Sequence, residues 1–245
     1  MAGVMQSEST RMGDNAVERF FQEYGDLYHA VLDWRLAYSV VKRLACPLRD
    51  RAVLDYGCGP GRFTRLLRDR GARVIGADTS SETIDRARKA DTRGITYLLI
   101  NSGDLAQVPI RSVDVAVATF VLCCVQEQAD LERICKSIYE RLRSGGSFVL
   151  AEPHPDAVSR EFYSMRRMAA AKLAEGVPLE VQVLTGTELV VHEFWHSRQA
   201  HTAALRKAGF FIEHVIEPTM SVYPDEPWWR DERTTPPFMI LRARK

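Results

Sequence analysis

The chain has 245 residues, 46% of them hydrophobic and 27% charged, and its formal net charge is +1. These values are ordinary for a globular protein, and the balanced charge argues against a protein whose main task is to grip nucleic acid or an anionic membrane. The five cysteines form no CxxC pair, so we expect reduced thiols and no metal site. No apolar run approaches about 18 residues, so we expect no membrane span and a cytoplasmic location.

The first part of the chain divides into a polar start, a helical segment and an alternating segment. Residues 1–12 are expected to be disordered, and residues 13–45 carry apolar side chains at helical spacing. Within residues 46–153 the pattern predicts strands at 52–57, 73–78, 95–101, 113–122 and 147–153, and helices at 61–71, 80–90 and 128–146. Apolar strands that alternate with helices predict a parallel sheet covered on both faces.

The pattern changes after residue 153 and returns after residue 195. Residues 154–195, which we call the cap, are predicted to hold a helix at 159–176 and an antiparallel strand pair at 179–195. Residues 196–245 then continue the α/β core, with a helix at 196–210 and strands at 211–218 and 237–245. The economical interpretation is one domain, residues 1–245, with the cap inserted into it to cover a substrate.

A cluster of glycines follows the first predicted strand in "VLDYGCGPGRF". Glycines between a strand and a helix let a ligand approach the backbone and the helix N-terminus. A dinucleotide fingerprint requires a small residue at the sixth position of G-x-G-x-x-G/A, where this chain has Arg62. The pattern therefore weakens the interpretation as a dinucleotide site.

Three acidic residues stand at or just after the ends of the first three strands: Asp55, Asp78 and Asp104. They suit a ligand with a cationic amino-acid end, a ribose diol and an adenine, and they suit a pyrophosphate poorly. Structural roles remain open for each. Asp55 is expected to organise the amides of the glycine turn, Asp78 could cap the next helix, and Asp104 could be a turn residue.

At these residues the chain resembles the class I S-adenosylmethionine-dependent methyltransferases of the small-molecule type. The resemblance covers about residues 50–153 and rests on five motifs in the usual order: "VLDYGCGPG", "VIGADTS", "NSGDL", "SVDVAVATFVL" and "ERLRSGGSFVLAEPHP". It implies a Rossmann-like fold in which a seven-stranded, mostly parallel sheet has the order 3-2-1-4-5-7-6, with strand 7 antiparallel. It also implies S-adenosyl-L-methionine as the cofactor.

The resemblance assigns cofactor contacts position by position. Gly57, Cys58, Gly59 and Gly61 would approach the methionine part, and Asp78 would hold the ribose hydroxyls. Thr79, Asp104 and Leu105 would lie at the adenine, and the backbone of Thr119 would line the sulfonium. Tyr24 resembles the N-terminal aromatic residues that close over the cofactor.

The acceptor is narrowed by the motifs that the chain lacks. Neither the [DNS]-PP-[YF] motif nor the Pro-Cys nucleophile of nucleic-acid methyltransferases is present. We therefore expect methylation of an O or N atom of a small metabolite or natural product, and no nucleic-acid or membrane partner. Aromatic residues of the cap suggest an apolar or aromatic acceptor, although they could equally form the cap's own core: Phe162, Tyr163, Phe194 and Trp195.

Methyl transfer is an in-line displacement, driven mainly by proximity, in which some acceptors also need a general base. Histidine has a suitable pKa, and His154 and His196 are the candidate bases. His192 is expected on the solvent face of a strand and His201 on a helix surface. Two other functions stay open: a nicotinamide-dependent oxidoreductase and a non-catalytic protein that binds S-adenosylmethionine.

Overall fold

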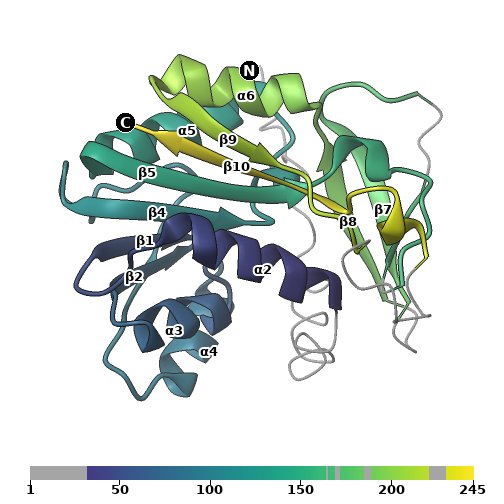
Figure 1. The fold of residues 1–245 in the computed structure, drawn as a ribbon. Coiled ribbons are helices and arrows are strands. Elements are labelled where there is room, and N and C mark those ends of the chain that lie inside the picture. The colour runs from purple at the N-terminus through teal and green to yellow at the C-terminus, as the bar shows by residue number, and fades with distance from the viewer. Residues whose placement is uncertain (1–31, 164, 169–171, 185–188, 221–229) are drawn as a thin grey trace, which may run out of the picture.

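The computed structural model describes residues 32–163, 165–168, 172–184, 189–220 and 230–245. A seven-stranded sheet forms the centre of the molecule, and a separate three-stranded sheet lies at one end of it (Figure 1). None of the helices in the described part of the chain is long and apolar enough to cross a lipid bilayer.

The central sheet has the order β3-β2-β1-β4-β5-β10-β9. Its strands are β1 (Ala52–Tyr56), β2 (Arg73–Asp78), β3 (Thr96–Leu99), β4 (Val113–Thr119), β5 (Leu142–Pro153), β9 (Phe211–Ile216) and β10 (Phe238–Arg244). The first five are parallel, and β10 runs antiparallel to both β5 and β9. Since β9 and β10 are the sixth and seventh strands of this sheet in chain order, the predicted order 3-2-1-4-5-7-6 is confirmed.

Helices cover both faces of the central sheet. They are α2 (Leu32–Ala45), α3 (Arg62–Asp69), α4 (Ser81–Ala90), α5 (Gln128–Arg141) and α6 (Arg198–Ala208). Helix α2 lies in the predicted helical segment, whereas Tyr24 lies outside the described residues. The helix predicted to reach residue 146 ends at Arg141, because the residues that follow already belong to β5 and pair with β4 and β10.

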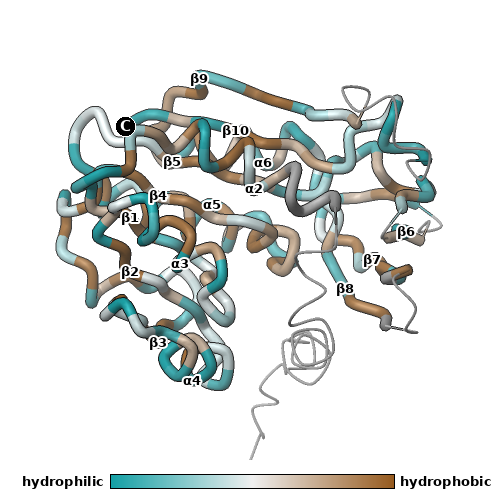
Figure 2. The backbone as a smooth tube through the Cα atoms, turned by 60° about the horizontal axis from the view of Figure 1, so that its bottom comes forward, coloured by the Kyte–Doolittle hydropathy of each residue, from teal (hydrophilic) through white to brown (hydrophobic). Residues whose placement is uncertain are grey.

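Two apolar layers hold the helices against the sheet. Adjacent strand residues point to opposite faces, and accordingly Leu54 packs with residues of α5 and α6 while Val53 packs with residues of α2 and α3. Hydrophobic residues gather along the central strands (Figure 2). The core thus fixes the carboxyl ends of β1, β2 and β4, where the predicted cofactor residues stand.

The cap segment differs from its prediction in one element. Instead of a helix at 159–176, the described residues there include the strand β6 (Met165–Arg167), preceded by the short helix η3 (Pro155–Ala157). Pairing with the neighbouring strand overrides the local helical preference, because Met165–Arg167 pair antiparallel with Val181–Val183. The predicted strand pair is confirmed as β7 (Val177–Val183) and β8 (Leu189–Trp195).

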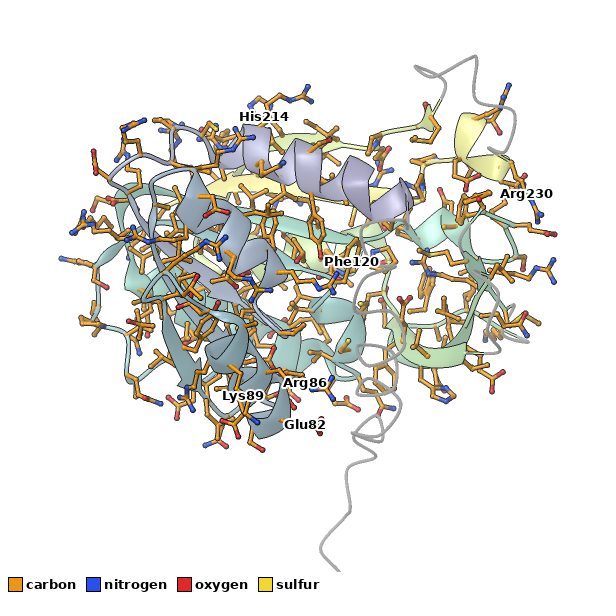
Figure 3. The ribbon with its side chains drawn as sticks, turned by 90° about the horizontal axis from the view of Figure 1, so that it is seen from below. Glu82, Arg86, Lys89, Phe120, His214 and Arg230 are labelled. Atoms are coloured by element: carbon orange, nitrogen blue, oxygen red, sulfur yellow. The ribbon has the colours of Figure 1, made fainter. Side chains whose placement is uncertain are left out.

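The inner face of this second sheet packs against the end of the central sheet. Met165 and Val181 form one apolar cluster with Phe162, and with Phe238 at the start of β10. Phe120, the residue after β4, packs against the same cluster and lies between the core and the cap (Figure 3). The interface between cap and core therefore lies beside the carboxyl end of β4.

Candidate cofactor and acceptor site

The turn between β1 and α3 depends on glycine for two reasons. Gly57, Gly59 and Gly61 have φ angles of 72°, 52° and 76°, a region that L side chains rarely adopt. Space is also missing, because a Cβ atom on Gly57 would lie 2.3 Å from Val121 Cγ2, and one on Gly61 would lie 2.5 Å from the Tyr97 hydroxyl. The turn can therefore bring its backbone close to a ligand only with glycine at these positions.

The glycine turn is fixed to the end of β2. The amides of Gly57 and Cys58 donate to the carbonyl oxygen of Ala77, at 2.7 and 3.1 Å. Gly61 is the N-cap of α3 and offers no side chain to the first amides of that helix. This arrangement leaves the N-terminus of α3 open to an adjoining ligand.

Asp78 joins the glycine turn to the next helix. Its Oδ2 accepts from the Gly59 amide at 2.8 Å, and its Oδ1 accepts from the Ser80 amide at 2.9 Å and from the Thr83 hydroxyl at 3.3 Å. Burial raises the pKa of this carboxyl, and the hydrogen bonds oppose that rise. A carboxylate has about four acceptor positions, so Asp78 helps to cap α4 and retains capacity on Oδ2 for a further donor.

Asp55 lies buried beneath the same turn. Its Oδ2 accepts from the Thr64 hydroxyl at 2.6 Å, while its Oδ1 has no hydrogen-bond partner in the described part of the structure. The bond to Thr64 differs from the expected bonds to the turn amides. Burial raises the pKa of Asp55 to about 7, and the nearby Asp78 carboxyl adds to the rise.

The raised pKa of Asp55 predicts that the free energy of unfolding falls as the pH rises from about 4 to about 7. The folded state holds a proton on Asp55 in this window, whereas the unfolded chain, with a pKa of 3.8, has lost it. Asp55→Asn cannot ionise and still offers Thr64 an acceptor. We expect the free energy of unfolding of the variant, relative to that of the natural chain, to rise by about 2–4 kcal/mol between pH 4.5 and 7.5. Urea denaturation across this pH range measures the change.

The matched control for this titration is Asp104→Asn, because Asp104 is exposed and lies outside the core. As a surface change, it should alter the free energy of unfolding by less than about 0.5 kcal/mol. Equal pH profiles for Asp55→Asn and the natural chain would show that Asp55 ionises normally in the folded protein.

The residues assigned to the adenine have structural roles in the described fold. Asp104 Oδ1 accepts from the Ala106 amide at 2.9 Å, which is a turn interaction, and Thr79 is exposed. The Leu105 side chain is 1% exposed and packs in the main core. Sequence reasoning missed Tyr56, whose hydroxyl accepts from the Gly103 amide at 2.8 Å and fixes this loop to β1.

Glu152 organises the segment that follows β4. Its carboxylate accepts from the amides of Val121, Leu122 and Cys123 at 3.2, 2.9 and 2.8 Å. The residue is fully buried, and burial raises its pKa to about 7. Thr119, at the end of β4, is therefore followed by a loop that is held in place from β5, which no local sequence pattern indicated.

The two candidate bases are buried and make contacts with protein groups. His154, next to the end of β5, accepts from the Asp156 amide through Nδ1 at 3.1 Å, and its Nε2 lies 3.1 Å from Glu217 Oε1. His196 has Nε2 at 2.7 Å from the Val125 carbonyl oxygen and Nδ1 at 3.4 Å from Glu175 Oε2. These contacts fit an anchoring role for both imidazoles.

The other two histidines divide between surface and interior. His192 is exposed on β8, so its prediction is confirmed. The prediction for His201 is wrong, because its side chain faces the interior and is 3% exposed. Its Nδ1 lies 2.9 Å from the Ser197 carbonyl oxygen, one helical turn earlier, and burial lowers its pKa to about 4. A helical period alone did not reveal which face of α6 it occupies.

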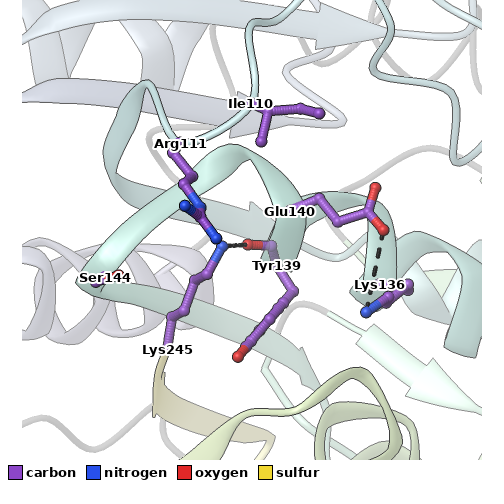
Figure 4. Close-up of a pocket in the computed structure, with 7 residues that line it drawn as sticks. All are labelled: Ile110, Arg111, Lys136, Tyr139, Glu140, Ser144 and Lys245. Carbon is purple, nitrogen blue, oxygen red and sulfur yellow. Dashed lines mark hydrogen bonds and ion pairs between the residues drawn. The ribbon is translucent and has the colours of Figure 1, made fainter.

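A pocket lies at the end of the central sheet opposite the glycine turn (Figure 4). It has a volume of about 360 Å³ and is lined by Ile110, Arg111, Lys136, Tyr139, Glu140, Ser144 and Lys245. The Lys245 ammonium donates to the carbonyl oxygens of Tyr139 and Leu142 at 2.7 and 2.8 Å, so it satisfies the end of α5. This pocket is remote from the glycine turn, which stands at the carboxyl ends of the strands.

Comparisons with known proteins relate this chain to methyltransferases. A family model described as a methyltransferase domain matches residues 54–150. N-demethylindolmycin N-methyltransferase of Streptomyces griseus is 27% identical over 227 residues, which cover 87% of this chain and 92% of that protein. A probable S-adenosylmethionine-dependent methyltransferase of Mycolicibacterium smegmatis is 29% identical, covering 80% of this chain and 74% of the relative.

A solved structure gives the same result. An S-adenosylmethionine-dependent methyltransferase from Mesorhizobium loti matches 84% of this chain and 96% of its own, with 25% identity and a TM-score of 0.65. The family match includes the glycine turn, Asp78 and the segment after β4. The matched range therefore contains most of the residues of the candidate site.

Proposed function

Because the chain is a class I S-adenosylmethionine-dependent methyltransferase, we propose that it methylates an oxygen or nitrogen atom of a small apolar or aromatic metabolite. The family match and the relatives support S-adenosylmethionine as the cofactor and methyl transfer as the activity, in preference to the nicotinamide-dependent and non-catalytic alternatives. The acceptor class rests on the apolar interface of Phe120, Phe162 and Phe238 beside the end of β4. The relative from Streptomyces griseus is named as an N-methyltransferase, which supports nitrogen as one accepting atom.

The residues at the glycine turn fit this cofactor. The remaining acceptor capacity of Asp78 Oδ2, beside the glycine turn, suits a ligand with hydroxyl donors. When bound, S-adenosylmethionine supplies an electrophilic methyl group on a sulfonium. We propose that Gly57, Cys58, Gly59 and Gly61 approach its methionine part and that Asp78 accepts from the ribose hydroxyls.

The remaining cofactor contacts are proposed at the edges of the site. Thr79, Asp104 and Leu105 would surround the adenine, where the core position of Leu105 limits its contribution. The backbone of Thr119 would lie near the sulfonium. Tyr24, which is not among the described residues, would close over the cofactor. Residues 154–195 would act as the cap that covers the acceptor.

In this proposal the protein holds the acceptor in line with the methyl group and excludes water. The bound cofactor would supply the methyl group to the lone pair of the acceptor and leave as S-adenosylhomocysteine, and a proton on the accepting atom would pass to solvent or to a base. The contacts of His154 and His196 favour positioning over proton transfer. His154 joins the cap to Glu217 of the core, and His196 lies between Glu175 of the cap and Val125 of the core.

The experiment that tests this function is a screen of small acceptors with methyl-labelled S-adenosylmethionine, followed by the changes His154→Gln and His196→Gln. If proximity provides the rate, each variant should keep turnover within about tenfold and bind the cofactor normally. Removal of a general base would lower turnover by about 10²–10⁴-fold. His192→Gln serves as the exposed control, and a loss of that larger size in either variant would identify the base.

A further inference from the structure

Arg167 is an arginine with almost no exposure. It is the last residue of the edge strand β6, and it is 2% exposed. Charged side chains are rarely buried so completely unless they are paired and hydrogen-bonded. The partners of this guanidinium therefore need to be accounted for.

Only part of the guanidinium is satisfied. Its Nε donates to Glu193 Oε2 at 3.0 Å, and its Nη2 lies 4.0 Å from the Met165 sulfur, a weak acceptor. Its Nη1 has no hydrogen-bond partner within the described residues. Since a guanidinium has five N–H donors, the edge formed by Nη1 and Nη2 is left without a strong acceptor.

The strand register places Arg167 on the inner face of the cap. Arg167 pairs with Val181, and Val181 pairs with Val191, so these three side chains share one face. Val181 belongs to the apolar cluster that contacts Phe238 and Phe120. The unsatisfied edge therefore belongs to a side chain at the interface of cap and core, close to the proposed position of the acceptor.

Glu193 is suited to orient the guanidinium. It lies on β8, two residues from Val191 and on the same face, and its side chain is 16% exposed. Because Glu193 contacts Nε, it leaves the Nη1–Nη2 edge open, and that edge matches the two oxygens of a carboxylate.

We propose that Arg167 binds a carboxylate of the methyl acceptor through Nη1 and Nη2, with Glu193 as its positioning residue. This inference rests on the proposed function and deepens it, because it makes the acceptor an apolar or aromatic acid. The carboxylate is an anchor, and the methyl group goes to another oxygen or nitrogen of the same molecule. Arg167 takes part in no bond making or breaking.

The test compares phenylacetate with phenylacetamide as probes, in the presence of saturating S-adenosylhomocysteine. The two molecules share a shape and differ in charge, so their affinity ratio measures recognition of the carboxylate. Calorimetry on the natural chain should give at least tenfold tighter binding of the acid. Arg167→Met should remove this preference, and Arg167→Lys should reduce it, since a lysine ammonium lacks the two-pronged geometry.

Two further variants separate binding from stability. Arg166→Met is the matched control, because Arg166 is its neighbour, is partly exposed and pairs with Glu161; it should keep the preference. The double change Arg167→Met with Glu193→Met removes both charges, and buried ion pairs replaced by apolar residues are often neutral for stability. It should fold, bind S-adenosylhomocysteine normally and bind both probes equally.

Equal binding of acid and amide by the natural chain would overturn the inference, as would an acid preference that survives in the double variant. Failure of the natural chain to bind S-adenosylhomocysteine would instead count against the cofactor site. The two failures are therefore distinguishable.

Discussion

Replacing Asp78 with alanine is expected to weaken binding of S-adenosylhomocysteine by about 10- to 150-fold, or about 1.5–3 kcal/mol. The carboxylate is the proposed acceptor for the ribose hydroxyls, and it also holds the Gly59 amide at 2.8 Å. The change would therefore remove a ligand contact and release the glycine turn together. Calorimetric titration of the variant and the natural chain measures the difference directly.

Ser80→Ala provides the control for the helix-capping role of Asp78. Ser80 caps α4 by accepting from the Thr83 amide at 3.3 Å, and loss of such a cap lowers stability by about 0.5–2 kcal/mol. This variant should unfold more easily and bind S-adenosylhomocysteine with normal affinity. If Asp78→Ala also binds normally, the residue only caps α4 and the ribose assignment is wrong.

Replacing Glu152 with alanine should lower the free energy of unfolding by about 3–5 kcal/mol. Three amides, of Val121, Leu122 and Cys123, would lose their acceptor in a buried position, and an unsatisfied buried donor costs about 1–3 kcal/mol. The effects of three neighbouring donors are not additive, because the loop can relax. Urea denaturation at constant pH measures the change.

Glu140→Ala is the matched control for this variant. Glu140 makes two 4.0 Å ion pairs, with Lys136 and Arg141, and its side chain is 45% exposed, so its loss should change stability by less than about 0.5 kcal/mol. Similar stability of the two alanine variants would contradict the capping role of Glu152. Glu152→Gln should lie between them, because one carbonyl oxygen remains while the new amide group faces donors.

Local patterns in the sequence predict the cofactor end of the fold because each signal there spans consecutive residues. The strand at 52–57, the glycines after it and Asp78 at the end of the next strand all follow from short-range rules. The positive φ angles of Gly57, Gly59 and Gly61 agree with that analysis. The remaining cofactor contacts came from the family resemblance and stay predictions.

The acceptor end could not be predicted in the same way, because its contacts join distant segments. Residues 159–176 contain helix-forming alanines, yet Met165–Arg167 form a strand because Val181–Val183 lie alongside. The bond of Arg167 to Glu193 spans 26 positions and leaves no periodic signal. The same holds for the contact between His154 and Glu217, 63 positions apart.

The position of β10 between β5 and β9 has a consequence for biosynthesis. In the central sheet β9 pairs only with β10, and β5 exposes one edge until β10 arrives. Strands β1–β5 can assemble while the ribosome is still translating the rest, but the sheet stays open until residues 238–244 emerge. A ribosome that stalls before Phe238 would leave one edge of β5 and both edges of β9 open to pairing with other chains.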